Sequence, residues 1–196
     1  MIAGLILAAG GSRRLGRPKQ LEPWGRDATL LGTVVDSARP FGLDELWIVL
    51  GSEIDEIMEA VDLSDIGVIE NPEWEEGLAS SIRVGLDALT RMSRADAVFL
   101  ILGDQPGLDP ELVATMITHK ARSKRMAIVP KYRYMWGHPV LVDRTLWPRL
   151  ISLSGDEGAK RLLQAHPEWV EEVWVESLPP RDVDTSADVE ELRPRR

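Results

Sequence analysis

Cysteine is absent from the chain, histidine occurs only three times in 196 residues, and acidic side chains outnumber basic ones. Without cysteine the protein has neither disulfides nor thiolate metal sites, which fits a cytoplasmic location. The net charge of -9 argues against general nucleic-acid binding, because a surface that follows phosphates is usually basic. No apolar run is long enough to cross a bilayer, and the first one has no basic leader. We therefore expect a cytoplasmic protein that binds neither nucleic acid nor membranes.

The composition is otherwise that of a globular protein, with 44% hydrophobic and 28% charged residues. The length predicts one domain over residues 1–196, with a frayed tail over about 190–196. Strand-like runs alternate with helix-like runs, which indicates an α/β fold with a parallel sheet and crossover helices. Apolar runs predict strands at 2–9, 46–50, 66–69, 97–102, 126–129, 140–142 and 170–176, the last at an edge. Apolar spacing and capping residues predict helices that begin near Thr29, Ile54, Ser80 or Ser81, Asp109, Gly155 and Asp188.

A glycine-rich basic turn follows the first predicted strand. Three glycines and four cations gather there, namely Gly10, Gly11, Gly16, Arg13, Arg14, Arg17 and Lys19. Glycines let backbone N–H groups approach an anion, and guanidinium and ammonium groups bind phosphate oxygens. The turn therefore predicts a polyphosphate site, and a solvated basic surface turn is the alternative. It is neither a P-loop, since Pro18 disfavours a helix directly after the last glycine, nor a Gly-x-Gly-x-x-Gly dinucleotide loop.

Two acidic segments are candidate metal ligands. Asp104 directly follows the predicted strand at 97–102, at the end where ligands of open parallel sheets bind. Mg2+ prefers one or two protein carboxylates together with phosphate oxygens. The alternative for Asp104 is a turn aspartate that accepts backbone N–H bonds. Asp182 and Asp184 belong to an acidic stretch before the last helix, which can equally be a solvated helix start.

Several other polar and aromatic residues allow two interpretations. Ser80 or Ser81 either caps a helix or binds an anion at its N-terminus, and Asp156 either caps a helix or binds a substrate. The aromatic and cationic residues at 132–136 can stack on a flat ring and hold a phosphate, but they fit a half-exposed hairpin better. His138 is either a structural hydrogen-bonding residue or a substrate contact.

Residues 7–16 and Lys19 match the nucleotidyltransferase signature Leu-Ala-Ala-Gly-x-Ser-x-Arg-Leu/Met-Gly-x-x-Lys, and the chain resembles most the molybdenum cofactor cytidylyltransferase-like proteins. The resemblance runs from Leu5 to about Val189. It includes Asn-Pro-x-Trp-x-x-Gly-x-x-x-Ser at 71–81, Gly-Asp-Gln-Pro at 103–106, Gly-His-Pro at 137–139 and Gly-Asp-x-Gly at 155–158. It implies a three-layer Rossmann-like nucleotidyltransferase fold with a central, mostly parallel sheet. Gly11 and Leu15 depart from the commoner pattern, and neither disables the loop.

The resemblance also implies roles for individual residues. Catalysis falls to Arg13, which clamps the β- and γ-phosphates, to Lys19, which balances charge at the α-phosphate, and to Asp104. Mg2+ is held by Asp104 and Asp184, with Asp182 in reserve for the second position. The nucleotide-binding residues are Leu7, Ala8, Ala9, Gly10, Gly11, Ser12, Arg13, Lys19, Asn71, Gly77, Ser80 and Ser81. The acceptor-binding residues are Gln105, Pro106, Trp136, Gly137, His138 and Asp156.

The implied activity is Mg2+-dependent transfer of CMP from CTP to a phosphate acceptor such as molybdopterin, with release of pyrophosphate. An acceptor phosphate is already ionised, so neither a side-chain nucleophile nor a general base is required. Cytidine is implied by the ending Leu-Ala-Ala-Gly at 7–10, since guanosine-specific relatives end Leu-Ala-Gly-Gly. A molybdoenzyme that receives the product is an implied partner. The rival hypotheses are an oxidoreductase that resembles nicotine blue oxidoreductase, a non-catalytic cofactor chaperone, and a sugar-phosphate nucleotidyltransferase.

Overall fold

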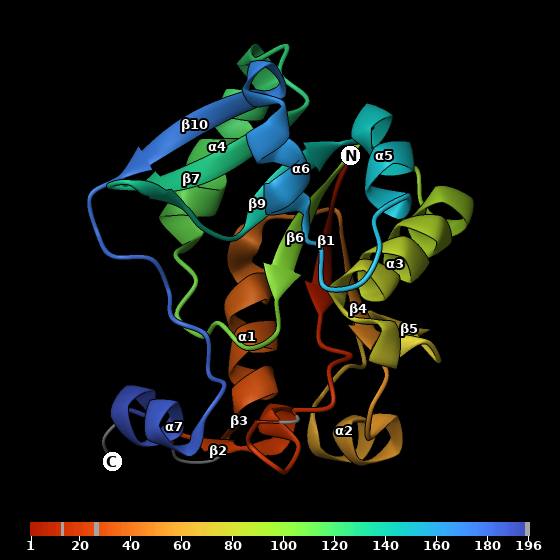
Figure 1. The fold of residues 1–196 in the computed structure, drawn as a ribbon, viewed down its shortest axis with the longest axis vertical. Helices are drawn as coiled ribbons and strands as arrows, with labels where there is room; N and C mark the ends of the chain where they lie inside the picture. The colour runs from red at the N-terminus through yellow and green to blue at the C-terminus, as the bar shows by residue number, and fades with distance from the viewer. Residues whose placement is uncertain (13, 26–27, 195–196) are drawn as a thin grey trace.

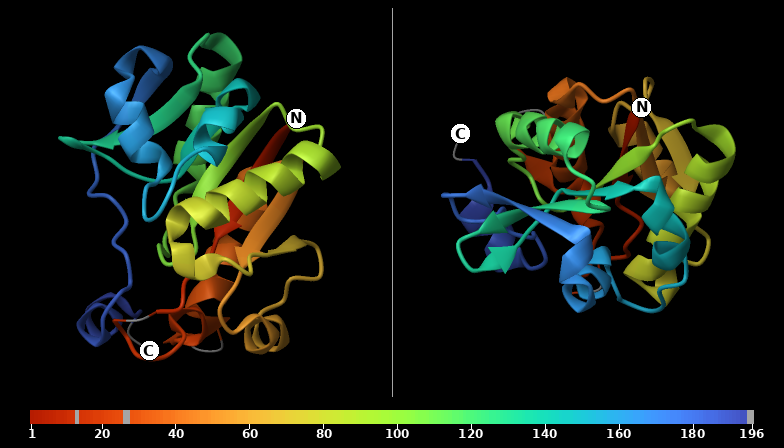
Figure 2. Two further views of the ribbon diagram at one scale, coloured as in Figure 1. Left: turned by 45° about the vertical axis from the view of Figure 1, so that its right-hand side comes forward. Right: turned by 90° about the horizontal axis from the view of Figure 1, so that it is seen from above.

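The protein folds into three layers, with a sheet between two groups of helices (Figure 1, Figure 2). The computed structural model describes residues 1–12, 14–25 and 28–194. The main sheet contains β1 (Ile2–Leu7), β4 (Glu45–Leu50), β5 (Gly67–Glu70), β6 (Ala97–Leu102), β7 (Ala127–Tyr132), β8 (Met135–Trp136), β9 (Val140–Asp143) and β10 (Val170–Val175), and a two-stranded sheet pairs β2 (Pro23–Trp24) with β3 (Ala28–Thr29).

The helices are α1 (Leu30–Ala38), α2 (Ile54–Ala60), α3 (Leu78–Met92), α4 (Pro110–Arg122), α5 (Trp147–Ile151), α6 (Ala159–Ala165) and α7 (Ser186–Leu192). Short 3-10 helices are η1 (Lys19–Leu21), η2 (Arg39–Phe41), η3 (Trp74–Glu76), η4 (Arg144–Leu146) and η5 (Pro167–Trp169). Among the helices in the described ranges, none is both long and apolar enough to span a membrane.

The main sheet has the strand order β10-β7-β9-β6-β1-β4-β5, and β8 pairs with β7. β1 pairs in parallel with β4 and β6, and the pairs β4–β5 and β10–β7 are parallel as well. β9 runs antiparallel between β6 and β7, and β8 runs antiparallel to β7. The predicted mostly parallel central sheet and the predicted edge position of β10 are therefore confirmed.

β1 is apolar throughout because neither of its faces contacts water. Leu5 packs in the cluster that includes α3, α5 and α6, whereas Ile6 packs in the cluster that includes α1, α2 and α4. The two helix groups thus cover opposite faces of the sheet. Burial of one such side chain stabilises a fold by roughly 1.5–3 kcal/mol, so a continuous apolar strand belongs at the centre.

Three predicted helix starts are confirmed: α2 begins at Ile54, and side chains cap the starts of α1 and α4. Thr29 Oγ1 accepts a hydrogen bond from the Gly32 N–H at 3.0 Å at the start of α1. Asp109 accepts one from the Glu111 N–H at 2.9 Å at the start of α4. Each side chain satisfies a backbone donor that the first helical turn leaves open.

Two other predicted helix starts are wrong. α3 begins at Leu78 with Gly77 at its N-cap, so Ser80 and Ser81 lie inside the first turn and do not cap it. α6 begins at Ala159, so Asp156 lies in the preceding loop and not in the first helical turn. In both cases the chain turns at a glycine before the helix, and the polar residue is free to serve another purpose.

Residues 190–192, the start of the predicted tail over 190–196, belong to α7 in the structure. α7 extends to Leu192, and Arg193 contacts the buried carboxylate of Glu22 at 3.3 Å. A capping box starts the helix, because Thr185 and Asp188 each bind the backbone N–H of the other. Residues 190–193 are therefore held in place by contacts that lie far away in sequence.

The C-terminal residues return to the start of the fold. Residues 176–185, which we call the C-terminal strap, cross the molecule from β10 to α7 (Figure 1). At the far end of the strap, Val183 and Val189 pack with Trp24 and Leu30 in a small separate cluster. This cluster brings the acidic residues of the strap next to the turn that follows β1.

Candidate functional site

A cavity of about 490 Å³ opens at the carboxyl ends of β1 and β6, the edge where open parallel sheets bind ligands. Its lining comes from the turn after β1, the β5–α3 loop, the end of β6, the loop before α6 and the C-terminal strap. The lining residues are Leu7, Ala8, Ala9, Gly10, Gly11, Arg14, Lys19, Gln20, Trp74, Glu75, Glu76, Gly77, Leu78, Ser81, Leu102, Gly103, Asp104, Asp156, Asp182 and Asp184. The glycine-rich turn and the acid after β6 therefore share one cavity.

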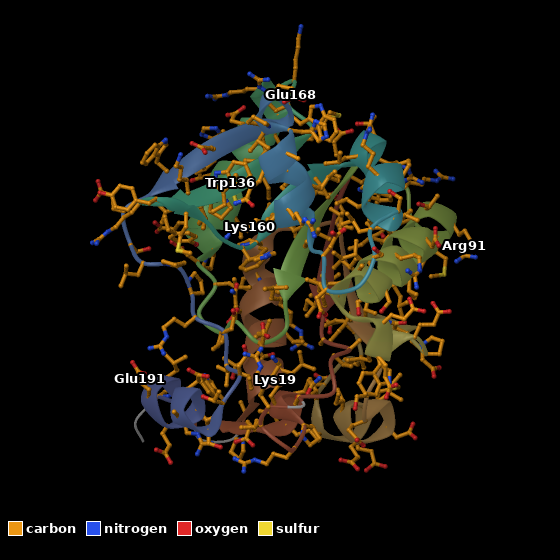
Figure 3. The ribbon with its side chains drawn as sticks, in the orientation of Figure 1. Lys19, Arg91, Trp136, Lys160, Glu168 and Glu191 are labelled. Carbon is orange, nitrogen blue, oxygen red and sulfur yellow. The ribbon has the colours of Figure 1, made fainter. Side chains whose placement is uncertain are left out.

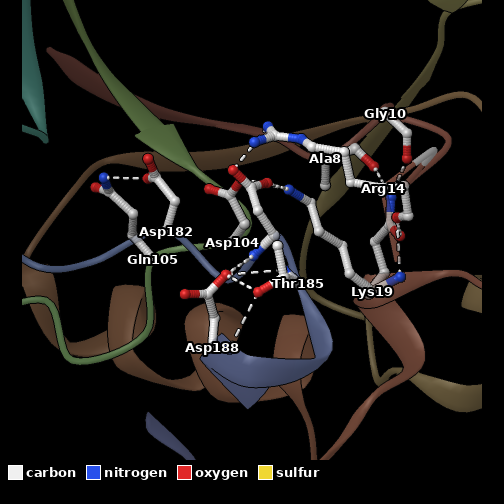
Figure 4. A network of polar contacts seen from close by, with 12 residues as sticks. Ala8, Gly10, Arg14, Lys19, Asp104, Gln105, Asp182, Thr185 and Asp188 are labelled. Carbon is white, nitrogen blue, oxygen red and sulfur yellow. Dashed lines mark hydrogen bonds and ion pairs between the residues drawn. The ribbon is translucent and has the colours of Figure 1, made fainter. Parts of the chain in front are cut away.

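Gln20 fixes the turn after β1. Its Nε2 donates to the carbonyl oxygens of Ala8 and Gly10 at 2.9 and 2.7 Å (Figure 4). Ser12, at a φ of 51°, accepts a hydrogen bond from the Lys19 N–H at 2.9 Å. Within the described residues, the backbone N–H groups of Gly10 and Gly11 have no acceptor. The carbonyls of the turn are thus occupied while its N–H groups stay available for an anion.

Lys19 stands between two carboxylates. Its Nζ donates to Asp104 Oδ2 at 2.6 Å and to Asp184 Oδ1 at 2.9 Å (Figure 4). Arg14 Nη2 lies 2.8 Å from Asp184 Oδ2. The side chains of Lys19, Asp104 and Asp184 are only 16%, 21% and 23% exposed. These ion pairs join the turn after β1, the end of β6 and the strap at one point.

Carboxylates outnumber cations around Asp104, and the pKa values of the site reflect this. Burial lowers the pKa of the Lys19 ammonium, but Asp104 and Asp184 outweigh burial, so its pKa lies above the usual value. Burial raises the pKa of the Asp104 carboxyl, and Asp182 and Asp184 raise it further against the opposing effect of Lys19. The site therefore favours an additional positive charge.

The two acids of the strap have different partners. Asp184 contacts Lys19 and Arg14, whereas Asp182 Oδ1 accepts a hydrogen bond from Gln105 Nε2 at 2.7 Å. Asp104 Oδ1 is buried and has no hydrogen-bond partner in the part of the chain that the structure describes. Across the same ranges, no group of three or more His, Cys, Asp or Glu side chains is arranged to hold a metal ion.

Asn71 orders the serines at the start of α3. Its Oδ1 accepts from the Glu73 N–H at 3.0 Å, and its Nδ2 donates to Ser80 Oγ at 2.9 Å and to Ser81 Oγ at 3.1 Å. Ser80 Oγ donates a hydrogen bond to the Gly77 carbonyl oxygen at 2.8 Å. Ser81 Oγ lines the cavity, and no acceptor is found for its proton in the described ranges. Ser81 can therefore donate to a ligand, while Asn71 and Ser80 are fully buried behind it.

The loop before α6 closes one side of the cavity. The Gly155 carbonyl accepts a hydrogen bond from the Ala79 N–H at 3.0 Å. A Cβ at Gly77, whose φ is 104°, would lie 2.7 Å from the same carbonyl oxygen and still closer to Asp156 Oδ1. Only glycine fits there, and Asp156 reaches the cavity because of this close approach.

The predicted acceptor residues at 136–138 do not reach this cavity. Trp136 Nε1 donates to Glu172 Oε1 at 2.7 Å, and Figure 3 shows Trp136 near β7 and β10, away from Lys19. Gly137 packs on the ring of Tyr132. His138 is partly buried with Nδ1 3.5 Å from the Leu100 carbonyl, and burial lowers its pKa. The segment forms the β7–β8 hairpin that the composition favoured.

Most of the other predicted residues come together. Leu7, Ala8, Ala9, Gly10, Gly11, Lys19, Gly77, Ser81, Asp104, Asp156 and Asp184 line the cavity, whereas Ser12, Asn71, Ser80, Gln105 and Pro106 do not. Arg13 lies outside the described residues.

Sequence reasoning assigned no role in the site to Gln20, Glu75, Glu76, Leu78, Leu102 and Gly103, which also line the cavity. It gave Arg14 no role beyond the basic turn, included Trp74 only in the motif at 71–81, and kept Asp182 in reserve as a metal ligand. The position of Gln20 directly after Lys19 is the one local signal that could have drawn attention to it.

Comparison with known proteins identifies the family of this chain. Residues 4–170 match the family model described as MobA-like NTP transferase domain. Nicotine blue oxidoreductase of Paenarthrobacter nicotinovorans is 32% identical, and the aligned region covers 96% of this chain and 92% of the relative. Molybdenum cofactor cytidylyltransferase of Escherichia coli (strain K12) is 30% identical over 141 residues, which cover 71% of this chain and 69% of the relative.

Solved structures show the same similarity. Rv0371c of Mycobacterium tuberculosis H37Rv superimposes with a TM-score of 0.86 and 37% identity, covering 97% of this chain and 96% of that protein. A second structure of Rv0371c, a complex with manganese, gives a TM-score of 0.81 and 34% identity, with coverages of 98% and 97%.

Proposed function

The chain belongs to the MobA-like NTP transferase family and is a nucleotidyltransferase, and from this premise we propose that it transfers CMP from CTP to a phosphate-bearing acceptor and releases pyrophosphate. The observation that carries the proposal is the shared cavity, in which Lys19 bridges Asp104 and Asp184 beside the glycine-rich turn. A turn that offers N–H groups, cations and carboxylates at one point suits a metal-bound triphosphate.

The turn after β1 binds the triphosphate in this proposal. The N–H groups of Gly10 and Gly11 and the guanidinium of Arg14 face oxygens of the phosphates, and Arg13 clamps the β- and γ-phosphates. Lys19 moves from its carboxylates to the α-phosphate, where it offsets the charge that grows during the reaction. An oxygen of the acceptor phosphate attacks the α-phosphorus in line, the bond to the β-phosphate oxygen breaks, and pyrophosphate leaves with the electron pair. The acceptor oxygen is already ionised, so the chain supplies no general base.

The residues around Asp104 fit a divalent cation. The Lys19 ammonium lies between Asp104 and Asp184, and the second oxygen of Asp104 is buried without a partner in the described ranges. Carboxylate oxygens are the ligands that Mg2+ prefers. We propose that Asp104 and Asp184 hold Mg2+, which neutralises charge on the phosphates when bound. Rv0371c, which is 34% identical to this chain, forms a complex with manganese, and this supports a divalent cation in the proposal.

Ser81 supports the choice of a pyrimidine base. Its hydroxyl accepts from Asn71 and keeps a proton to donate into the cavity. Cytosine offers two acceptors, O2 and N3, to such a donor, whereas the corresponding edge of guanine offers one acceptor, O6, beside the N–H donors at N1 and N2. The Escherichia coli relative is a molybdenum cofactor cytidylyltransferase, which agrees with this choice.

The same relative supports an acceptor of molybdopterin type, with a molybdoenzyme as the receiving partner. In this chain Asp156 is the predicted acceptor residue that lines the cavity, and Gln105 contributes by holding Asp182 in place. His138 is proposed to lie along the path of the acceptor and not at the reacting atoms.

Hydride transfer is a second candidate, because nicotine blue oxidoreductase matches nearly the whole chain at 32% identity. The chain lacks the Gly-x-Gly-x-x-Gly fingerprint of dinucleotide-binding turns, which counts against this candidate. Oxidation of a reduced nicotinamide cofactor in the absence of added metal would support it.

The deciding experiment measures pyrophosphate release from CTP, UTP, ATP and GTP with Mg2+ or Mn2+, with and without molybdopterin. We expect release from CTP only when metal and acceptor are both present, and transfer of label from [α-32P]CTP to the acceptor. No release from any triphosphate contradicts the proposal. A tightly held cofactor without turnover would instead indicate a chaperone.

A further inference from the structure

Trp74 rests directly on the turn after β1. It lies in η3, between β5 and α3, and its side chain packs on two glycines from other parts of the chain. A Cβ at Gly11 would lie 2.5 and 2.7 Å from the ring atoms Cζ3 and Cη2 of Trp74. A Cβ at Gly51 would lie 2.7 Å from Trp74 Cβ. The indole therefore occupies the space that side chains at both positions would need.

Gly11 is explained by this contact and not by backbone conformation. The positive φ angles in the described part of the turn belong to Ser12, at 51°, and Gly16, at 74°, whereas Gly11 is not in the left-handed region. Its neighbour Gly10 has open space, since a Cβ there would meet nothing within 4 Å. The extra glycine after Leu-Ala-Ala-Gly thus makes room for the ring of Trp74.

Trp74 connects the two halves of the nucleotide site. Gly11 belongs to the turn assigned to the phosphates, and η3 leads through Gly77 to Ser81, which is assigned to the base. Trp74 also lines the cavity and is the one aromatic side chain among the described residues that do so. Its remaining surface packs on the core cluster between the sheet and α3, so the ring has a rigid support.

We propose that Trp74 is a positioning residue that holds the phosphate turn and the base-side loop at a fixed separation, so that the enzyme binds a whole nucleoside triphosphate in preference to a bare triphosphate. The inference rests on the proposed function, because it needs a ligand with both a base and phosphates. Two binding groups joined in one ligand gain affinity only when their subsites are held at the matching distance. Trp74 acts through Gly11 and η3 and does not take part in the reaction itself.

Binding measurements on a double-mutant cycle test this inference. The dissociation constants of CTP and of inorganic tripolyphosphate, each with Mn2+, are measured by calorimetry for the parent, Gly11→Ala, Trp74→Ala and the double variant. Gly11→Ala should weaken CTP binding by roughly tenfold or more, because a side chain is forced into a filled space. In the Trp74→Ala background the same change should cost less than about twofold, because the space is then open.

Trp74→Ala alone should weaken CTP binding by roughly tenfold, whereas the affinity for tripolyphosphate should change by less than about threefold. Only CTP carries both a base and phosphates, so only CTP loses the benefit of a fixed separation between the two subsites. Gly10→Ala is the matched control in the same turn: whatever it costs, the cost should be equal with and without Trp74. Trp74→Phe, which keeps an aromatic contact, covers the case in which Trp74→Ala does not fold. It should lose part of the preference for CTP, though less than Trp74→Ala does, because the smaller ring lacks the atoms Cζ3 and Cη2 that contact Gly11.

The outcomes separate the two proposals. A parent protein that binds no nucleoside triphosphate overturns the proposed function and this inference with it. If the parent binds CTP, two results overturn this inference alone. One is that Gly11→Ala weakens CTP binding equally with and without Trp74. The other is that the ratio of CTP affinity to tripolyphosphate affinity is unchanged in Trp74→Ala and Trp74→Phe. A purely structural role for Trp74 would lower the melting temperature and leave that ratio unchanged.

Discussion

The ammonium of Lys19 lies 2.6 Å from a carboxylate oxygen of Asp104, although 85 residues separate them in the chain. The same ammonium also donates to Asp184, which lies 165 residues away in the sequence. One cation therefore neutralises part of an acidic cluster that would otherwise repel itself. The proposed reaction asks this cation to exchange places with a metal ion.

Lys19→Met should separate these two tasks. The transfer rate should fall by about 2–4 kcal/mol, or roughly 30- to 1,000-fold, which is the usual loss when one preorganised charge at a transition state is removed. Mn2+ should bind the nucleotide-free variant at least as tightly as the parent, because no ammonium competes for Asp104 and Asp184. Pyrophosphate release and electron paramagnetic resonance of Mn2+ measure the two effects.

Lys124→Met is the control, since it removes one exposed positive charge far from the cavity and should change neither quantity. A Lys19→Met protein that transfers at the parent rate, or that binds Mn2+ more weakly than the parent, would contradict the assignment.

The two acids of the strap should differ in metal binding. Asp184→Asn removes a carboxylate beside Lys19 and Arg14, so Mn2+ affinity should fall by about tenfold or more, as when one of few charged ligands is lost. Asp182→Asn replaces a group that already accepts from Gln105, and its effect should be smaller. Titration of Mn2+ into both variants makes the comparison. The reverse order would assign the second ligand to Asp182.

Ser81 and Ser80 offer a matched pair for base selection. Both hydroxyls accept a hydrogen bond from Asn71. Ser81 lines the cavity, whereas Ser80 donates a hydrogen bond to the Gly77 carbonyl oxygen. Ser81→Ala should weaken CTP binding by roughly tenfold, which is about the effect of one lost hydrogen bond at a buried site. The variant should also show a smaller preference for CTP over GTP. Ser80→Ala should lower stability and leave that preference intact. Equal selectivity in Ser81→Ala and the parent would remove the argument for cytosine.

His138 should make stability depend on pH. Burial lowers its pKa in the folded protein, so the unfolded chain takes up the proton first as the pH falls. This contribution is absent above the unfolded value of about 6.5 and destabilises the fold progressively below it, toward the lower folded pKa. Urea unfolding at about pH 7.5 and about pH 5.5 should show a smaller loss for His138→Gln than for the parent. Identical losses in both proteins would count against a buried neutral imidazole.

Local patterns were sufficient where a segment's environment follows from its own residues. The run at 2–9 predicts a doubly buried strand because it contains no polar position, and β1 covers 2–7 of it. Thr29 and Asp109 predict helix starts because their side chains reach the first free N–H groups. The apolar run at 140–142 carries no pattern that distinguishes a parallel from an antiparallel strand. Sequence therefore predicts a strand there but not that β9 runs antiparallel between β6 and β7.

Long-range contacts decided what local patterns could not. Trp136 was a plausible ring-stacking residue until the pairing of β10 with β7 placed Glu172 beside its indole N–H. Apart from its position directly after Lys19, Gln20 carries no local sign that it will bind the carbonyls of Ala8 and Gly10. The different partners of Asp182 and Asp184 likewise depend on how the strap lies against β6.

The C-terminal strap contributes residues to the cavity but lies outside the part of the chain that matches the family model. Asp184 lies beyond residues 4–170, the part of the chain that matches the family. A lineage that exchanged only its last residues would keep every strand of the main sheet and the phosphate turn, and yet lose the second acid. Exchange of the last residues alone is thus a route by which this fold could gain or lose a carboxylate of the cavity while the sheet stays the same.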